Sequence, residues 1–96
     1  MNAERVRTIA DAIPQVLDEL GLAGRLKEYE VLEIWAAVVG ERIAAVTIPQ
    51  RIDDGRLFVA VLRAPWRNEL LYLKSQLIEK LNAAMSGAIV KDIIFR

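Results

Sequence analysis

The segment TIPQRIDDGRLFVAVL at residues 47–62 decides the fold. Apolar side chains alternate with their neighbours on both sides of the central Asp53-Asp54-Gly55. Alternation with a period of two predicts strands, and an Asp-Gly pair between two such runs predicts a tight hairpin turn. We therefore expect strands over 47–52 and 57–62. Because Pro49 has no N–H to donate, the first strand should lie at an edge of its sheet.

A long helix and a final strand are predicted after the hairpin. Pro65 suits the first helical position, where a missing N–H costs little, although Ala64 before it is a poor N-cap. Apolar residues then recur every three or four positions, the spacing of one helix face. That face holds Trp66, Leu70, Leu73, Leu77, Leu81 and Ala84. Gly87 should close the helix, and the β-branched residues in 88–96 predict a strand.

Helical spacing also precedes the hairpin. One apolar stripe predicts a helix over about 28–45, with Trp35 in the core. Gly40 inside it suggests a close approach by another backbone, and the alternative is a glycine that the helix merely tolerates. A shorter helix is predicted over 14–20, with residues 1–13 as a second short helix or a loose arm. The last strand must join the hairpin to satisfy its backbone groups. The order α(α)ββαβ therefore predicts an α+β, two-layer domain, with a three-stranded sheet and helices on one face.

Composition narrows the classes of function. The chain has 96 residues, which is enough for one domain, and it contains no cysteine and no histidine. Disulfides, thiol nucleophiles and imidazole bases are therefore excluded, and we expect no enzyme, no cofactor, no metal site and no small-molecule substrate. The first residues are too charged for a signal peptide, and no apolar run approaches a membrane span. We expect a cytoplasmic protein without a membrane partner.

Charge is distributed unevenly along the chain. Residues 1–45 carry five basic and eight acidic side chains, a net charge of −3, whereas residues 46–96 carry eight and five, a net charge of +3. Candidate nucleic-acid contacts lie in the second half, where they could form a shallow positive strip. They are Arg51, Arg56, Arg63, Arg67 and Lys74. The alternative is that each is a solvated surface charge.

Two further patterns bear on binding. Trp66 should be half exposed in the first helical turn, where it could stack on a base or fill a partner's pocket. Leu71 and Ile78 lie off the main apolar stripe and form a candidate partner contact or a second buried side. Gly21 and Gly24 spell the GxxG pattern of KH domains, whose loop clamps a nucleic-acid backbone. Leu-Ala between these glycines carries no basic side chain, so we interpret the pattern as a helix end.

An ordered set of short motifs resembles the DciA family of bacterial replicative-helicase loaders. The matching pieces are Trp35, Val38-Val39-Gly40, Ile43, Pro49, residues 54–61, 66–70 and 90–95, and the leading segment 17–22. The resemblance implies a KH-like domain covering nearly the whole of residues 1–96. It also implies a non-enzymatic adaptor that binds the replicative DNA helicase and assists its placement on single-stranded DNA, with weak, sequence-independent nucleic-acid contact. Many members of the family carry a zinc-binding segment, which a chain without cysteine and histidine cannot form.

Two other functions remain open at this point. The domain could act alone as a KH-like RNA- or DNA-binding module, or it could be a self-associating structural domain that uses its sheet edge. The absence of a GxxxxGK[ST] phosphate loop argues independently against an ATPase.

Overall fold

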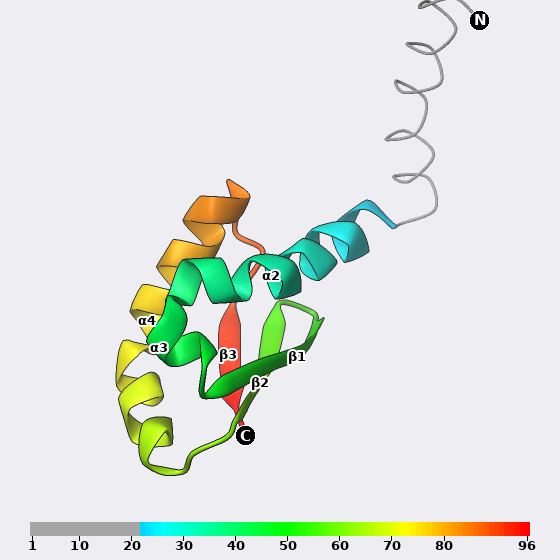
Figure 1. Cartoon of the computed structure of the whole chain (residues 1–96). Coiled ribbons are helices and arrows are strands. Elements are labelled where there is room, and N and C mark those ends of the chain that lie inside the picture. Colours follow the sequence, from blue (N-terminus) through cyan, green and yellow to red (C-terminus); the bar gives the residue numbers. More distant parts are fainter. Residues whose placement is uncertain (1–21) are drawn as a thin grey trace, which may run out of the picture.

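The structure is a computed structural model that describes residues 22–96, and its elements are labelled as in Figure 1. They follow the order α2 (Ala23–Val39), α3 (Glu41–Ala44), β1 (Thr47–Asp53), β2 (Arg56–Val61), α4 (Pro65–Met85) and β3 (Asp92–Phe95). The predicted α+β class and the three-stranded sheet are confirmed. The helix predicted over 14–20, the arm over 1–13 and Gly21 lie outside the described residues.

The hairpin turn has the geometry that its sequence favours. Asp54 and Gly55 both take positive φ angles, 51° and 81°, and Asp53 pairs directly with Arg56. Two central residues with positive φ match the right-handed twist of the flanking strands, and Asp-Gly is among the pairs that adopt them most readily. This turn fixes the register between β1 and β2.

The sheet is mixed, with strand order β1-β2-β3. β1 pairs antiparallel with β2, and β3 pairs parallel with β2 on its other side. Pro49 lies in the edge strand β1, as predicted, and the register shifts between Pro49 and Arg51 so that Gln50 is bulged. α4 connects β2 to β3 and runs beside β3, while α2 crosses over the sheet (Figure 1).

The last strand is shorter than the sequence predicts. β3 covers only 92–95, and residues 88–91 are not a strand. The Nδ2 of Asn82 donates to the carbonyl of Val90 at 2.9 Å, and the N–H of Val90 donates to the Oδ1 of Asn82 at 2.8 Å. A side-chain amide thus takes the place of a neighbouring strand at Val90. The alternation expected from Ala88 onward therefore fails, and Val90 packs in the core while Ile94 lies on the other side of the sheet.

Gly40 divides the helix that was predicted to continue over 28–45. α2 begins earlier, at Ala23, and ends at Val39, because Gly40 has φ 91° and ψ 164°, a conformation essentially reserved for glycine. α3 then begins at Glu41 in a new direction. The prediction that another backbone approaches Gly40 is wrong, since a Cβ there would meet no atom within 4 Å. Gly24 lies inside α2, so it does not form a clamp loop.

α4 follows the predicted stripe except at its end. Pro65 begins the helix, Ala64 makes no side-chain cap, and Leu70, Leu77 and Leu81 are buried. Ala84 is exposed, contrary to the prediction, because the buried stripe continues to Met85 instead. The helix ends at Met85 and is capped by Ser86, which adopts the left-handed conformation with φ 55°, one residue before the predicted Gly87.

The core lies between the helices and one face of the sheet. Its fully buried side chains are Val31, Trp35, Leu57, Val59, Leu70, Leu81 and Ile93. Leu57, Val59 and Ile93 alternate along β2 and β3, so the side chains between them point to the opposite face. That opposite face is where the candidate contacts begin.

In the part of the chain that the structure describes, no helix is both long and apolar enough to cross a bilayer.

Candidate nucleic-acid and partner interface

The sheet face that points away from the helices carries apolar and cationic side chains together. Strand alternation places Arg51, Phe58 and Ile94 on this face, in addition to Ile48, which is 50% exposed. Leu62 follows β2 with the same alternation and is 57% exposed. We call this surface, comprising Ile48, Arg51, Phe58, Leu62, Ile94 and Arg96, the open face.

Two guanidinium groups cover the one aromatic ring of the open face. The Cζ of Arg51 lies 4.5 Å from the centroid of the Phe58 ring, and the Cζ of Arg96 lies 4.6 Å from it. Phe58 is only 7% exposed, although it is outside the hydrophobic core cluster, whereas both arginines are exposed. Cation–π attraction and the apolar arginine stems therefore hold two charged groups at the surface in a fixed arrangement.

Lys74 and Arg56 lie on either side of Asp92 at the start of β3. Lys74 Nζ lies 3.1 Å from Asp92 Oδ1, and Arg56 is the register partner of Asp92. The hydrogen bond from Lys74 has the largest effect and lowers the pKa of Asp92 below its ordinary value. Burial opposes it with the second-largest effect, and the N–H of Ile93 and the charge of Arg56 lower the pKa further. A phosphate at this point would compete with Asp92 for Lys74.

Arg63 and Arg67 lie near the N-terminal end of α4. Both are exposed, and neither makes an ion pair among residues 22–96. β2 runs from Arg56 to Val61, so Arg63 lies beyond one end of the strand and Arg56 at the other. The five predicted cations thus differ in their surroundings. Arg51 lies over Phe58, Arg56 and Lys74 lie beside Asp92, and Arg63 and Arg67 lie near the start of α4.

Trp66 lines a pocket of about 410 Å³ between the Gly40 turn and the start of α4. The indole is half-buried, and the Cζ of Arg42 lies 5.8 Å from its ring centroid. Four apolar and three charged side chains line it together with Gly40. The apolar ones are Val39, Ile43, Trp66 and Leu73, and the charged ones are Glu41, Arg42 and Glu69. We call this the Trp66 pocket.

Leu71 and Ile78 do not join the Trp66 pocket. They lie seven positions apart and therefore share one flank of α4, together with Lys74, which faces β3. Leu71 is 49% exposed, but Ile78 is half-buried against the core cluster. Of the two, only Leu71 presents substantial apolar surface to solvent.

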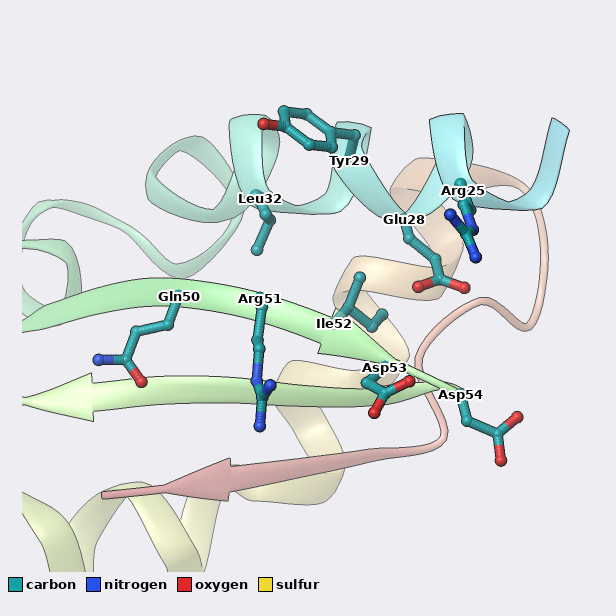
Figure 2. A pocket seen from close by; sticks show the side chains of 9 residues that line it. All are labelled: Arg25, Glu28, Tyr29, Leu32, Gln50, Arg51, Ile52, Asp53 and Asp54. Atoms are coloured by element: carbon teal, nitrogen blue, oxygen red, sulfur yellow. The ribbon is translucent and has the colours of Figure 1, made fainter. Parts of the chain in front are cut away.

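A second groove of about 460 Å³ lies between α2 and the edge strand β1. Figure 2 shows Glu28 pointing from α2 toward the hairpin and Asp54 pointing away from the groove at the turn. Arg25 and Glu28 line it from α2, whereas the guanidinium of Arg51 points away from α2 and lies over Phe58 (Figure 2). Among residues 22–96, no group of three or more acidic side chains could hold a metal ion.

Sequence reasoning missed Arg96 and Phe58 as a functional pair, and Arg42 beside Trp66. Alternation does put Arg96 on the same side as Ile94, so the signal for Arg96 was present. The pairing with Phe58 needs the β2–β3 register, in which Phe58 is opposite Ile94, and a register between distant segments cannot be read from periodicity.

Comparison with known proteins adds relatives to this geometry. A family model described as Dna[CI] antecedent, DciA matches residues 8–95. A UPF0232 protein of Rhodococcus jostii is 33% identical over 78 residues, which cover 81% of this chain and 42% of the relative. A UPF0232 protein of Mycobacterium tuberculosis is 31% identical over 85 residues, covering 88% of this chain and 46% of the relative.

The chain therefore matches less than half the length of these relatives. The family match nevertheless spans α2, the hairpin, α4 and β3 up to its last residue, so it covers every element described above. The resemblance drawn from the motifs is confirmed: the chain belongs to the DciA family.

Proposed function

We propose that the chain is a non-enzymatic adaptor that binds the replicative DNA helicase and assists its placement on single-stranded DNA in the cytoplasm. The observation that carries this proposal is the family match over residues 8–95. In this proposal residues 1–96 act as one KH-like domain. Such a role needs surfaces that bind macromolecules, and it needs no reacting group in this chain.

The Trp66 pocket is the surface to which we assign the helicase. Aromatic side chains in partly enclosed apolar pockets are typical anchors of protein interfaces, and a charged rim excludes water and selects the partner. The lining of the pocket combines a half-buried indole and Leu73 with the charged side chains of Arg42 and Glu69, and the residues Arg42 and Glu69 are exposed. An apolar side chain of the helicase would fill it, flanked by polar groups that pair with the rim.

Titration calorimetry of the full chain against the cognate replicative helicase tests the proposal. The wild type should bind, and Glu69→Lys should weaken binding about tenfold or more, because it reverses a charge at the pocket margin. Glu79→Lys is the matched control, since Glu79 is exposed on the same helix and outside both grooves. It should bind as the wild type does.

Two results would contradict the proposal in different ways. Failure of the wild-type chain to bind the helicase would refute the adaptor function. Equal loss in Glu69→Lys and Glu79→Lys would leave the adaptor function in place but refute the assignment of the Trp66 pocket. Charge reversal of Arg63 and Arg67 together, measured on helicase and on DNA separately, would then show whether the start of α4 serves either partner.

A further inference from the structure

We propose that the open face binds single-stranded nucleic acid, with the guanidinium groups of Arg51 and Arg96 on Phe58 as its central contact. The inference deepens the proposed function, on which it rests for the presence of a single-stranded ligand. What it adds is the place of contact, on the side of the sheet opposite the helices and away from Gly24 and the first turn of α2.

The arrangement of the two arginines is the first argument. Both guanidinium groups lie within 4.6 Å of the Phe58 ring centroid, and both arginine side chains are exposed to solvent. An arginine that is already held in place loses less freedom when it binds than a mobile one. Its outward plane can stack on a base, and its N–H groups can donate to phosphate oxygens.

The second argument is the distribution of charge. Neither Arg51 nor Arg96 has a carboxylate within ion-pair distance among residues 22–96, where Lys74–Asp92 is the one ion pair. The acidic side chains of the sheet instead gather at its hairpin end, where Asp53, Asp54 and Asp92 lie. Arg56, Lys74 and Lys91 lie at the same end and offset these carboxylates. A polyanion would therefore be attracted most strongly to the two arginines that make no ion pair, Arg51 and Arg96.

The third argument is the apolar surface beside these charges. Ile48 and Leu62 remain 50% and 57% exposed, although they are neighbours across the β1–β2 ladder at the end of the sheet away from the hairpin. Unstacked bases offer flat apolar faces between their phosphates, whereas a duplex hides its bases and an acidic peptide offers only charge. Cations next to exposed apolar side chains therefore fit a single strand best.

Fluorescence anisotropy with a labelled oligothymidylate tests the site on the full chain. For single strands the slope of log K against log salt is about −0.7 per phosphate contact, so Arg51→Gln/Arg96→Gln should make it shallower by about 1.4. The same variant should lose affinity about tenfold or more, because stacking is lost as well. Arg51→Lys/Arg96→Lys should keep the slope, since charge is retained, and still lose affinity with the planar groups.

The matched control is Lys27→Gln/Lys80→Gln, which removes the same net charge from exposed helix positions outside the open face. Its affinity should fall much less than that of the arginine variant. Thermal unfolding of all three variants measures whether the sheet around Phe58 remains folded. The lysine variant keeps the ring covered by its side-chain stems, so it remains informative even if the glutamine variant unfolds.

The results divide clearly. Equal losses of affinity in Arg51→Gln/Arg96→Gln and in the control Lys27→Gln/Lys80→Gln would overturn the inference, because binding would then follow net charge alone. The inference would also be overturned if polyglutamate or a DNA duplex lost as much affinity in Arg51→Gln/Arg96→Gln as oligothymidylate does. The ligand would then be an acidic protein or a duplex. Failure of the helicase experiment with an intact arginine effect would refute the adaptor function and leave the open face as a nucleic-acid site.

Discussion

The indole Nε1–H of Trp35 donates a buried hydrogen bond of 3.0 Å to the hydroxyl oxygen of Thr47. That hydroxyl in turn donates to the carbonyl of Ile43 at 2.7 Å. Trp35 is 1% exposed and Thr47 5% exposed, so neither group has access to water as a substitute. One side chain of β1 thus satisfies a donor on α2 and an acceptor on α3, and it connects the three elements around the Gly40 break.

Thr47→Val should destabilise the fold by about 1–3 kcal/mol, because it leaves the buried indole N–H of Trp35 without a partner inside the protein. The Ile43 carbonyl would keep the hydrogen bond of 3.1 Å that it accepts from the N–H of Val46. Urea unfolding followed by tryptophan fluorescence measures the loss. Thr47→Ser keeps the hydroxyl and removes one methyl group, so its cost should stay near 0.8 kcal/mol. Equal stability of the valine and serine variants would show that the hydroxyl contributes nothing.

Asn82→Ala should cost about 1–3 kcal/mol, since both hydrogen bonds to the Val90 backbone are lost. The loss should appear first in the segment before β3, as faster amide exchange at Val90. Asn68→Ala is the control, because Asn68 is exposed in the same helix and alanine is the better helix former. A variant at Asn82 as stable as that at Asn68 would contradict the role of the amide as a substitute strand.

Gly40→Ala and Gly24→Ala should act in opposite directions, although neither new methyl group would meet an atom within 4 Å. Alanine at Gly40 must adopt a conformation that costs about 1–3 kcal/mol outside glycine. Alanine at Gly24 replaces a helical glycine and should be neutral or stabilising, by up to about 1 kcal/mol. Thermal unfolding of both variants provides the comparison.

The Gly24 variant also addresses the GxxG pattern. If the glycine served a nucleic-acid clamp, Gly24→Ala would weaken oligothymidylate binding, whereas a position inside α2 predicts unchanged affinity.

Asp92→Asn should change how the free energy of unfolding depends on pH in the acid range. The pKa of Asp92 is lowered from 3.8, chiefly by Lys74, so the folded state binds its proton less readily than the unfolded chain does. Its contribution is therefore complete above pH 3.8 and is lost as the pH falls through the lowered value. The side chain of Asp92 is 47% exposed, so the contribution should stay below about 1 kcal/mol.

Melting temperatures recorded across the acid range should show the wild type and Asp92→Asn converging as the pH falls. Glu79→Gln is the control, because Glu79 makes no ion pair among the described residues. A constant difference between wild type and Asp92→Asn at every pH would contradict the proposed linkage.

Much of the fold could be predicted because its determinants are local. The Asp-Gly turn, the alternation on both sides of it and the stripe through Leu70, Leu77 and Leu81 each depend on residues a few positions apart. The errors at Gly40 and at residues 88–91 have a different origin. The φ angle that a glycine adopts cannot be predicted from its presence in the sequence, as Gly40 shows. The hydrogen bonds between the amide of Asn82 and the backbone of Val90 are side-chain contacts, which periodicity does not reveal.

The candidate site was less predictable than the fold, since it depends on contacts between distant segments. Lys74 and Asp92 are distant in the sequence, so their ion pair could not be predicted from the spacing of residues. Arg51 and Arg96 meet over Phe58 because three strands align in one register. The side chains that bear charge were visible in the sequence, but their grouping was not.

The irregular edge strand has a consequence for how the molecule behaves among its own copies. A straight, fully hydrogen-bonding border recruits strands from other chains and can start fibril growth. Here Pro49 has no N–H to donate, and the bulge at Gln50 interrupts the regular spacing of the backbone hydrogen-bonding groups. A strand from another chain therefore cannot pair along the whole of β1 in one register. The β1 edge is therefore a poor template for the addition of strands from other copies, as amyloid growth would require.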